Sequence, residues 1–321
     1  MAQRVLILGA GGYVGRHIVS AVKQCHWATP VPALRRPGAA DEAGVVLDGT
    51  DASALAKALD GVHAVINCVA GSPKTIADNA HALHQALAGR SSTIRLVHFS
   101  SMAVYGSAVG HVTEATPLAE GLGGYAGAKV EAERVLARLG DLVILRPGCI
   151  YGPGSPQWTV RIERLLRAGR IGDLGAGGDG CSNLVHIDDV VSATLAALGG
   201  ACPASPQVFN LAMPDAPTWN DYFVRYARKL GAVPVRRISR RRLALESRVL
   251  APILKLGELA TRDRGACVPP PIPPSLVRLW AQDIRLDAGE ASRQLSVSWR
   301  SLAEGLDTAT SSRTHKVSPC D

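Results

Sequence analysis

The sequence has few aromatic residues, no paired cysteine motif and no long apolar run. Its 321 residues include seven cysteines without a CxxC pair, which argues against a zinc site and a disulfide framework. No apolar stretch reaches the roughly 20 residues of a membrane-spanning helix, and the first residues do not form a signal peptide. These absences predict a soluble protein of the reducing cytoplasm that holds no metal.

The positive charge is unevenly distributed. Part of the net charge of +8 lies in residues 236–248, RRISRRRLALESR. Aromatic side chains, which would stack on bases, make up only 4% of the chain, so we expect no nucleic-acid partner.

The overlapping stretch 240–262 has leucines and valines at helical spacing. It could line an apolar substrate cavity or lie on a membrane surface. We favour a helix packed on the domain with a solvated basic face, bent or split at Pro252.

Apolar runs alternate with helical patterns over the first two thirds of the chain. Such alternation implies parallel strands joined by right-handed crossovers, which predicts an α/β fold with a doubly wound sheet of the Rossmann type. Strands are predicted at 4–10, 63–71, 94–101 and 141–148, and helices at 13–25, 75–89 and 129–140.

The second strand of this pattern is the least regular and falls within 29–36. Pro30 and Pro32 each remove a hydrogen-bond donor. We therefore expect the strand to start late, near Val31 or Ala33.

A glycine cluster follows the first strand and leads directly into a helix. Gly9, Gly12 and Gly15 are spaced as GxxGxxG, and Val14 stands where a GxGxxG motif would have its last glycine. Glycines let the backbone approach a pyrophosphate, and the helix N-terminus at Tyr13 offers free N–H groups and a positive dipole end. The loop predicts a dinucleotide site.

Further motifs follow in one order: INCVAG, VHFSSMAVYG, YAGAK, LRPGCIYGPG and LVHIDDV. Together with the glycine loop they resemble the extended short-chain dehydrogenase/reductase superfamily, in its epimerase/dehydratase-like branch. The resemblance covers residues 4–200 and continues weakly to 295–307. It implies an NAD(P)-dependent enzyme and a homodimer formed through a helix pair that includes 125–139.

The pattern loosens after residue 150. A helix over 216–231, capped by Thr218 through Asp221, and an extended proline-rich segment at 267–275 are predicted there. We divide the chain into an NAD(P)-binding domain (1–200, with substrate elements interleaved from about 150), a mostly helical substrate lobe (201–308) and a flexible tail (309–321).

The resemblance also indicates the cofactor. Arg35 and Arg36 follow the second strand, where NAD-preferring sites carry an acidic residue, and no acid precedes Asp41. Unless these arginines only decorate a surface turn, they suit a 2′-phosphate, so we expect NADP(H) rather than NAD(H). The other residues implied at the cofactor are Gly9, Gly12, Tyr13, Val14, Gly15, Asp48, Asn67, Val69, Ala70, Tyr125, Lys129 and Pro147.

A Ser-Tyr-Lys catalytic set is implied by the same resemblance. Tyr125 stands four residues before Lys129, which places both side chains on one helix face. In this superfamily the tyrosine exchanges a proton with the substrate oxygen, the lysine lowers the pKa of the tyrosine, and a hydroxyl holds the oxygen. That hydroxyl is Ser101, four residues before Tyr105, and Ser100 is then a buried helper.

Two departures from the family narrow the chemistry. Dehydratases of this branch carry an acidic pair directly after the catalytic hydroxyl, where this chain has Met102 and Ala103, so we expect no dehydration. Nucleotide-sugar enzymes carry an arginine for the substrate diphosphate before the VH strand, whereas this chain has Cys-Ser-Asn at 181–183 and no cation nearby. An apolar substrate, contacted by Met102, Tyr151 and Asn183, is the expectation.

One further cluster, formed by His186, Asp188 and Asp189, looks like a metal site out of context. In the family this stretch is a junction between a strand and a helix, and we expect the same here.

These features predict an NADP(H)-dependent reductase or dehydrogenase that interconverts a ketone and a secondary alcohol on a largely apolar small molecule. A nucleotide-sugar epimerase with tightly bound NAD and the same three catalytic residues is one alternative. A non-catalytic dinucleotide-binding subunit is another, although such a subunit would be expected to lose Tyr125 or Lys129.

Overall fold

A seven-stranded parallel sheet forms the centre of the computed structural model, which describes residues 2–36, 44–90, 93–199, 207–252, 254 and 270–311. The strand order is β10-β7-β5-β4-β1-β2-β3, and every neighbouring pair is parallel. The strands are β1 (Gln3–Leu8), β2 (Ala28–Leu34), β3 (Val45–Val46), β4 (Ala64–Asn67), β5 (Arg95–Phe99), β7 (Leu142–Pro147) and β10 (Gln207–Leu211).

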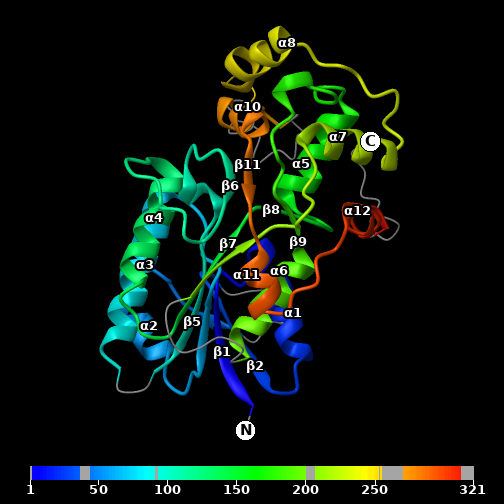
Figure 1. The fold of residues 1–321 in the computed structure, drawn as a ribbon. Coiled ribbons are helices and arrows are strands. Elements are labelled where there is room, and N and C mark those ends of the chain that lie inside the picture. The colour runs from blue at the N-terminus through cyan, green and yellow to red at the C-terminus, as the bar shows by residue number, and fades with distance from the viewer. Residues whose placement is uncertain are drawn as a thin grey trace.

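Helices cover both faces of this sheet (Figure 1). One face packs on α2 (Ala52–Ala58), α3 (Pro73–Ala88) and α4 (Gly124–Leu136). The other packs on α1 (Tyr13–Gln24), α6 (Ile187–Leu198) and α11 (Gly289–Gln294). The predicted doubly wound Rossmann-type fold is therefore confirmed.

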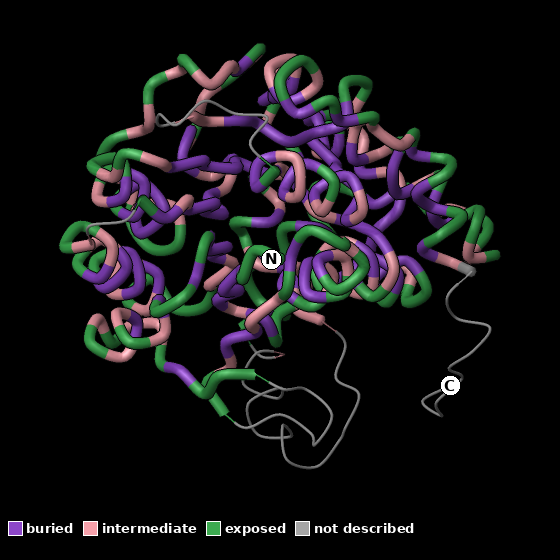
Figure 2. Tube along the Cα trace, turned by 90° about the horizontal axis from the view of Figure 1, so that it is seen from below, coloured by how far each residue is buried: buried purple, intermediate pink, exposed green. Residues whose placement is uncertain are grey.

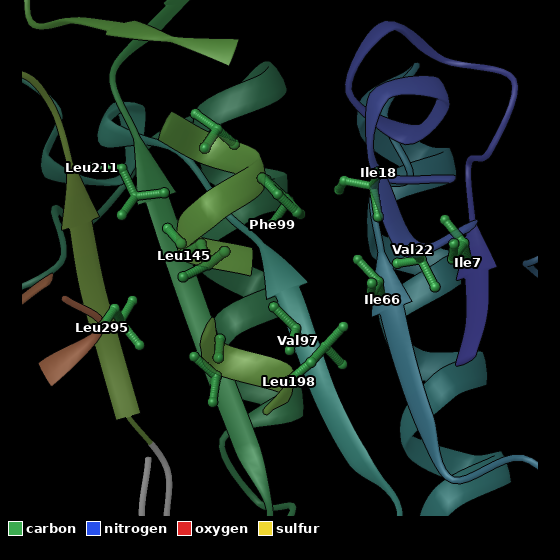
Figure 3. Close-up of a cluster of buried hydrophobic side chains, with 14 of the residues drawn as sticks. Ile7, Ile18, Val22, Ile66, Val97, Phe99, Leu145, Leu198, Leu211 and Leu295 are labelled. Atoms are coloured by element: carbon green, nitrogen blue, oxygen red, sulfur yellow. The ribbon is translucent and has the colours of Figure 1, made fainter. Parts of the chain in front are cut away.

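Apolar side chains hold the layers together. Ile18 and Val22 of α1 point toward Ile7 of β1 and Ile66 of β4 (Figure 3), and all four are fully buried. Burial of one such side chain stabilises the fold by about 1.5–3 kcal/mol. Viewed from below, buried stretches run through the middle of the molecule, and exposed turns lie around them and in front of them (Figure 2).

The second strand starts earlier than its prolines suggested. β2 begins at Ala28 and includes both Pro30 and Pro32, paired with Val5 and Ile7 of β1. The expected start near Val31 or Ala33 was therefore wrong.

Hydrogen-bond direction explains why the prolines are tolerated. The Trp27 carbonyl accepts from Gln3 at the start of β1, whereas the Leu34 carbonyl accepts from Leu47, on the opposite side of the strand. Because donors and acceptors alternate sides along a strand, both prolines face the side of Leu34. There β3 pairs only with the last two residues of β2, so the prolines remove no bond of the β1–β2 ladder.

A largely helical lobe lies beyond the carboxyl ends of the strands (Figure 1). Its core contains the predicted helix, α7 (Trp219–Lys229), which is capped by Thr218, whose side chain accepts a hydrogen bond from the backbone N–H of Asp221. The lobe and its connections comprise β6 (Gly110–Val112), β8 (Cys149–Tyr151), α5 (Arg161–Arg167), β9 (Leu184–His186), α7 (Trp219–Lys229), α8 (Arg240–Leu245), α10 (Pro274–Ala281), β11 (Ile284–Leu286) and α12 (Leu302–Ser311), with short helical turns at Met102–Tyr105 (η1), Pro156–Val160 (η2), Gly175–Gly177 (η3) and Glu246–Leu250 (η4).

The two units are more interwoven than the predicted division at residue 200. Strand β10 and helix α11 come from the segment assigned to the lobe, yet β10 completes the sheet and α11 packs on it. In the proline-rich segment 267–275, α10 begins at Pro274, and residues 267–269 lie outside the described residues. Helix α12 continues to Ser311, past the expected start of the tail, and the rest of that tail is not described.

None of the described helices is both long enough and apolar enough to cross a membrane.

Candidate active site

The site lies at the carboxyl ends of β1 and β4, where the strand order of the sheet reverses direction. The connections that follow these two strands run to opposite faces of the sheet, which opens a crevice that commonly holds ligands in such sheets. Gly9, directly after β1, has φ +75°, and a Cβ atom there would lie 2.8 Å from the Cys68 carbonyl oxygen after β4. The two loops therefore touch, and only glycine fits between them.

Glycine also brings α1 against this loop. A Cβ atom at Gly15 would lie 2.2 Å from the Gly9 carbonyl oxygen, and Gly12 stands at the N-terminal cap without a side chain of its own. The first backbone N–H groups of α1 are thus close to the loop, in the arrangement that binds a phosphate. The geometry fits the predicted dinucleotide. Tyr13, Val14 and Gly15 form the first turn of α1.

A cavity of ≈ 360 Å³ opens beside this loop. Two of the predicted cofactor residues lie elsewhere: Arg36 is exposed, and Pro147 is the last residue of β7. Asp41, the first acid after the second strand, lies outside the described residues. The predicted cofactor residues that line the cavity are Gly9, Gly12, Arg35, Asp48, Val69 and Ala70.

Asp48 is fixed at the wall of this cavity by its neighbour Thr50. Its Oδ1 accepts hydrogen bonds from the Thr50 backbone N–H at 3.0 Å and from the Thr50 hydroxyl at 2.8 Å. These bonds, and to a smaller extent the charge of Arg35, lower the pKa of the Asp48 carboxyl. An anion is therefore held where the family resemblance places the adenine.

Asn67 supports the cavity from behind. Its Nδ2 donates to Asn79 Oδ1 at 2.7 Å and lies 3.1 Å from His98 Nδ1, while its Oδ1 accepts from the Val69 N–H at 3.2 Å. Asn79 in turn donates to the Gly49 carbonyl at 2.7 Å. This buried network fixes both Val69 and Gly49, which line the cavity.

The predicted catalytic residues come together beside the end of β5. Tyr125 and Lys129 both lie on α4, which begins five residues before the predicted helix. The Ser101 side chain is close enough to the Tyr125 hydroxyl to counter the rise in its pKa on burial, and Lys129 Nζ donates to the Phe99 carbonyl at 2.6 Å. Ser101 Oγ also accepts from the Ala103 N–H at 3.2 Å.

Burial changes the acidity of this group. Lys129 is 2% exposed, and desolvation lowers its pKa to about 8, against the opposing influence of Cys68 and Glu133. Tyr125 is 44% exposed; partial desolvation raises its pKa, and the Ser101 side chain opposes that shift. That Lys129 lowers the pKa of Tyr125 stays a prediction. Lys129 and Cys68 interact electrostatically, which connects the lysine to the cavity wall.

A buried polar chain behind α4 was missed from the sequence. Ser100 donates to Glu133, one helical turn beyond Lys129, and Glu133 forms an ion pair with Arg146 at 2.6 Å. Arg146 also donates to the Tyr105 hydroxyl at 2.8 Å. Ser100 is thus buried and paired, its helper role stays a prediction, and the four-residue spacing from Lys129 to Glu133 was the only sequence signal of this chain.

The residues predicted to contact substrate are all buried. Met102 belongs to an apolar cluster, and Tyr151 lies edge-on to His186 with ring centroids 5.3 Å apart. Asn183 Nδ2 donates to the Ile284 carbonyl at 2.7 Å, and its Oδ1 accepts from the Leu286 N–H at 2.9 Å. Asn183 therefore holds β11 in place, and its contact with substrate stays a prediction.

The surroundings of Cys181 include a cation from a distant part of the chain. Burial raises the pKa of Cys181, while the charge of Arg285 lowers it, so this arginine of β11 is close in space although distant in sequence. Arg285 Nε donates to Asp283 Oδ1 at 3.1 Å. The fold therefore brings one cation toward this segment, which has none nearby in the sequence.

The suspected metal cluster is a junction, as predicted. β9 ends at His186, and this side chain caps α6 by accepting from the Asp188 N–H. Among the described residues, no group of three or more His, Cys, Asp or Glu side chains could hold a metal ion.

A dinucleotide cradle beside a tyrosine and a lysine one helical turn apart defines the class of NAD(P)-dependent enzymes of the extended short-chain type. Sequence comparison agrees. The sequence model of the NAD dependent epimerase/dehydratase family matches residues 5–212, and the chain belongs to this family.

The individual relatives have low sequence identity to this chain. Protein YeeZ of Escherichia coli is 30% identical over 146 residues, 44% of this chain and 47% of YeeZ, so the match spans about half of that relative. The 2-alkyl-3-oxoalkanoate reductase of Stenotrophomonas maltophilia is 27% identical over 231 residues, 63% of this chain and 67% of that protein.

Among solved structures, the UDP-glucuronic acid 4-epimerase of Bacillus cereus in complex with UDP-glucuronic acid and NAD has a TM-score of 0.70. It is 18% identical, and the match covers 96% of this chain and 98% of that one. At this identity the likeness establishes the fold.

Proposed function

We propose that this protein is an NADP(H)-dependent reductase or dehydrogenase that interconverts a ketone and a secondary alcohol on a largely apolar small molecule. The observation that carries the proposal is the convergence of Ser101 and Tyr125 with buried Lys129, whose charge opposes the rise that burial causes in the pKa of Cys68 in the wall of the dinucleotide cavity. The nicotinamide supplies or accepts the hydride. Ser101 holds the substrate oxygen, and the Tyr125 hydroxyl gives or takes its proton.

Several observations support a reductase on an apolar ketone. Met102 and Ala103 leave no acid directly after Ser101 for a dehydration. The segment 181–183 carries no cation of its own and is buried. One relative, the 2-alkyl-3-oxoalkanoate reductase, is named for a ketone with alkyl substituents.

The preference for NADP(H) rests on Arg35. This arginine lines the cavity, and its guanidinium suits a 2′-phosphate. The ratio of kcat/KM with NADPH to that with NADH tests this part of the proposal. A ratio below one would contradict it.

The catalytic assignment is tested with Tyr125→Phe. Loss of the proton donor should reduce the rate of NADPH oxidation with 3-oxo esters and other apolar ketones by about 100- to 10,000-fold. Dinucleotide binding, followed by fluorescence, should change little. Tyr226→Phe is the matched control, because its hydroxyl lies in the lobe core 3.3 Å from Glu163, and it should retain activity.

The same assay separates the alternatives. Turnover of a UDP-sugar without net consumption of nicotinamide, by protein that retains NAD through purification, would establish the epimerase instead. Arg285 near Cys181 is the observation that keeps this candidate open. Full cellular function in a Tyr125→Phe strain would favour a non-catalytic dinucleotide-binding subunit.

A further inference from the structure

We propose that the outer surface of residues 233–250, here called the arginine surface, binds the headgroup region of an anionic lipid bilayer. This surface lies at the tip of the C-terminal lobe, where α8 is the outermost helix of the view (Figure 1). It takes no part in the dinucleotide cavity or the catalytic residues, so the inference is independent of the proposed function.

The exposed charges of the segment itself are all positive, and Asp173 Oδ2 of a neighbouring segment lies 3.7 Å from Nη1 of one of them, Arg237. Six arginines in the segment are exposed, namely Arg236, Arg237, Arg240, Arg241, Arg242 and Arg248. Glu246, the only acid in the segment, is buried against Arg170, with Arg170 Nε donating to its Oε2 at 3.0 Å. The exposed part of this segment is therefore purely cationic, which complements an anionic headgroup layer.

Apolar side chains are exposed among these arginines. The exposed fractions of Val233, Leu245 and Val249 are 60%, 61% and 53%, and Leu250 is 36% exposed. Such side chains gain by entering the boundary between headgroups and acyl chains while neighbouring arginines stay with the phosphates. The sequence alone could not distinguish this surface from an ordinary packed helix, because it does not tell which leucines are buried.

The opposite side of the same helical segment is anchored to the lobe. Leu243 belongs to the apolar core of the lobe, and Glu246 and Ser247 are buried. With that side held, Arg241, Leu245 and Val249 recur every four residues on the outer side. The protein therefore presents charged and apolar side chains together on one fixed helical surface instead of on a free peptide.

A nucleic acid would fit this surface less well. Binding to single strands relies on aromatic side chains that stack on bases, and residues 233–250 contain no Phe, Tyr or Trp. Exposed Leu245 and Val249 would gain nothing from a phosphate backbone, whereas a bilayer can bury them.

Cosedimentation with vesicles tests the proposal on the full chain. We expect binding to phosphatidylcholine vesicles that contain phosphatidylglycerol, little binding to pure phosphatidylcholine, and weakening with added salt. Each arginine near an anionic surface contributes about fivefold to partitioning. Arg241→Glu/Arg248→Glu should therefore reduce it by at least about 20-fold, and Leu245→Ser/Val249→Ser should reduce it several-fold at the same net charge.

The matched control is Lys57→Glu/Lys74→Glu, which makes the same change in net charge on exposed positions of α2 and α3. It should leave vesicle binding nearly unchanged. Equal losses in the control and the arginine variant would overturn the proposal, as would equal binding to neutral vesicles.

Two other occupants would also overturn it. One is single-stranded RNA, shown by tight binding of a labelled oligonucleotide without vesicle binding. The other is a second copy of the chain, shown by light scattering if Leu245→Ser/Val249→Ser converts an oligomer into a monomer.

Discussion

The burial of Lys129 predicts an alkaline gain in stability for the cofactor-free protein. The pKa of this lysine falls from its ordinary 10.5 to about 8 on folding, mainly because the ammonium loses its hydration. Between these two values the unfolded chain binds the proton and the folded protein does not. Stability must therefore rise with pH across this window.

The size of the effect follows from the shift. Each pKa unit corresponds to about 1.4 kcal/mol, so the Lys129 ammonium costs the folded state about 3 kcal/mol below pH 8, and this cost disappears by about pH 10.5. Because Lys129 is only 2% exposed, solvent screening reduces this free-energy cost little.

Lys129→Met is the perturbation that isolates this contribution. The variant keeps the length of the side chain and removes the proton, and it should be more stable than the parent near neutral pH. The assay is urea unfolding of both proteins at several pH values, and the quantity of interest is the difference in free energy of unfolding. Titrating groups that do not interact with Lys129 cancel in that difference, whereas Cys68, which does interact with it, is removed from the comparison by making both proteins with Cys68→Ala.

The expected result is a difference that shrinks by about 3 kcal/mol as the pH rises from about 8 to 10.5. A difference that stays constant over this range would refute the reasoning, because it would mean that the ammonium keeps its ordinary pKa in the fold.

Two further perturbations follow from the structure. Glu133→Gln leaves Arg146 buried without its ion pair and should destabilise the protein by about 3–5 kcal/mol. Asp78→Asn, which breaks an exposed ion pair with Lys74, should cost less than about 1 kcal/mol. Equal small losses of the two variants in urea unfolding would contradict the structural importance of the buried pair. Gly15→Ala places a methyl group 2.2 Å from the Gly9 carbonyl and should weaken dinucleotide affinity about tenfold or more. Gly89→Ala, where nothing lies within 4 Å, is the control for titration by fluorescence.

Features that depend on neighbours in sequence were predictable. The glycine loop, the pairing of Tyr125 with Lys129 and the cap formed by Thr218 with Asp221 each span only a few residues, and hydrogen-bond or helix geometry fixes what such spacings do. The order of strands and helices followed from the same local patterns.

Features that join distant segments were not predictable. Arg285 of β11 comes near Cys181, and Arg146 of β7 forms an ion pair with Glu133 of α4. Periodicity states that a residue is buried but gives no partner for it, so these contacts appear only once the chain is folded. Helix α2 was missed for another reason, because its alanines give little contrast between faces, although Asp51 caps it by accepting from two backbone N–H groups.

The prolines of β2 have a consequence beyond the pairing with β1. They leave the outward side of that strand without two donors, and β3 covers only its last two residues. Val45 and Val46 are 39% and 58% exposed there, and apolar side chains at this edge of the described sheet would ordinarily invite a strand from another molecule. Because the missing donors prevent a continuous ladder, this margin of the sheet resists aggregation by strand addition.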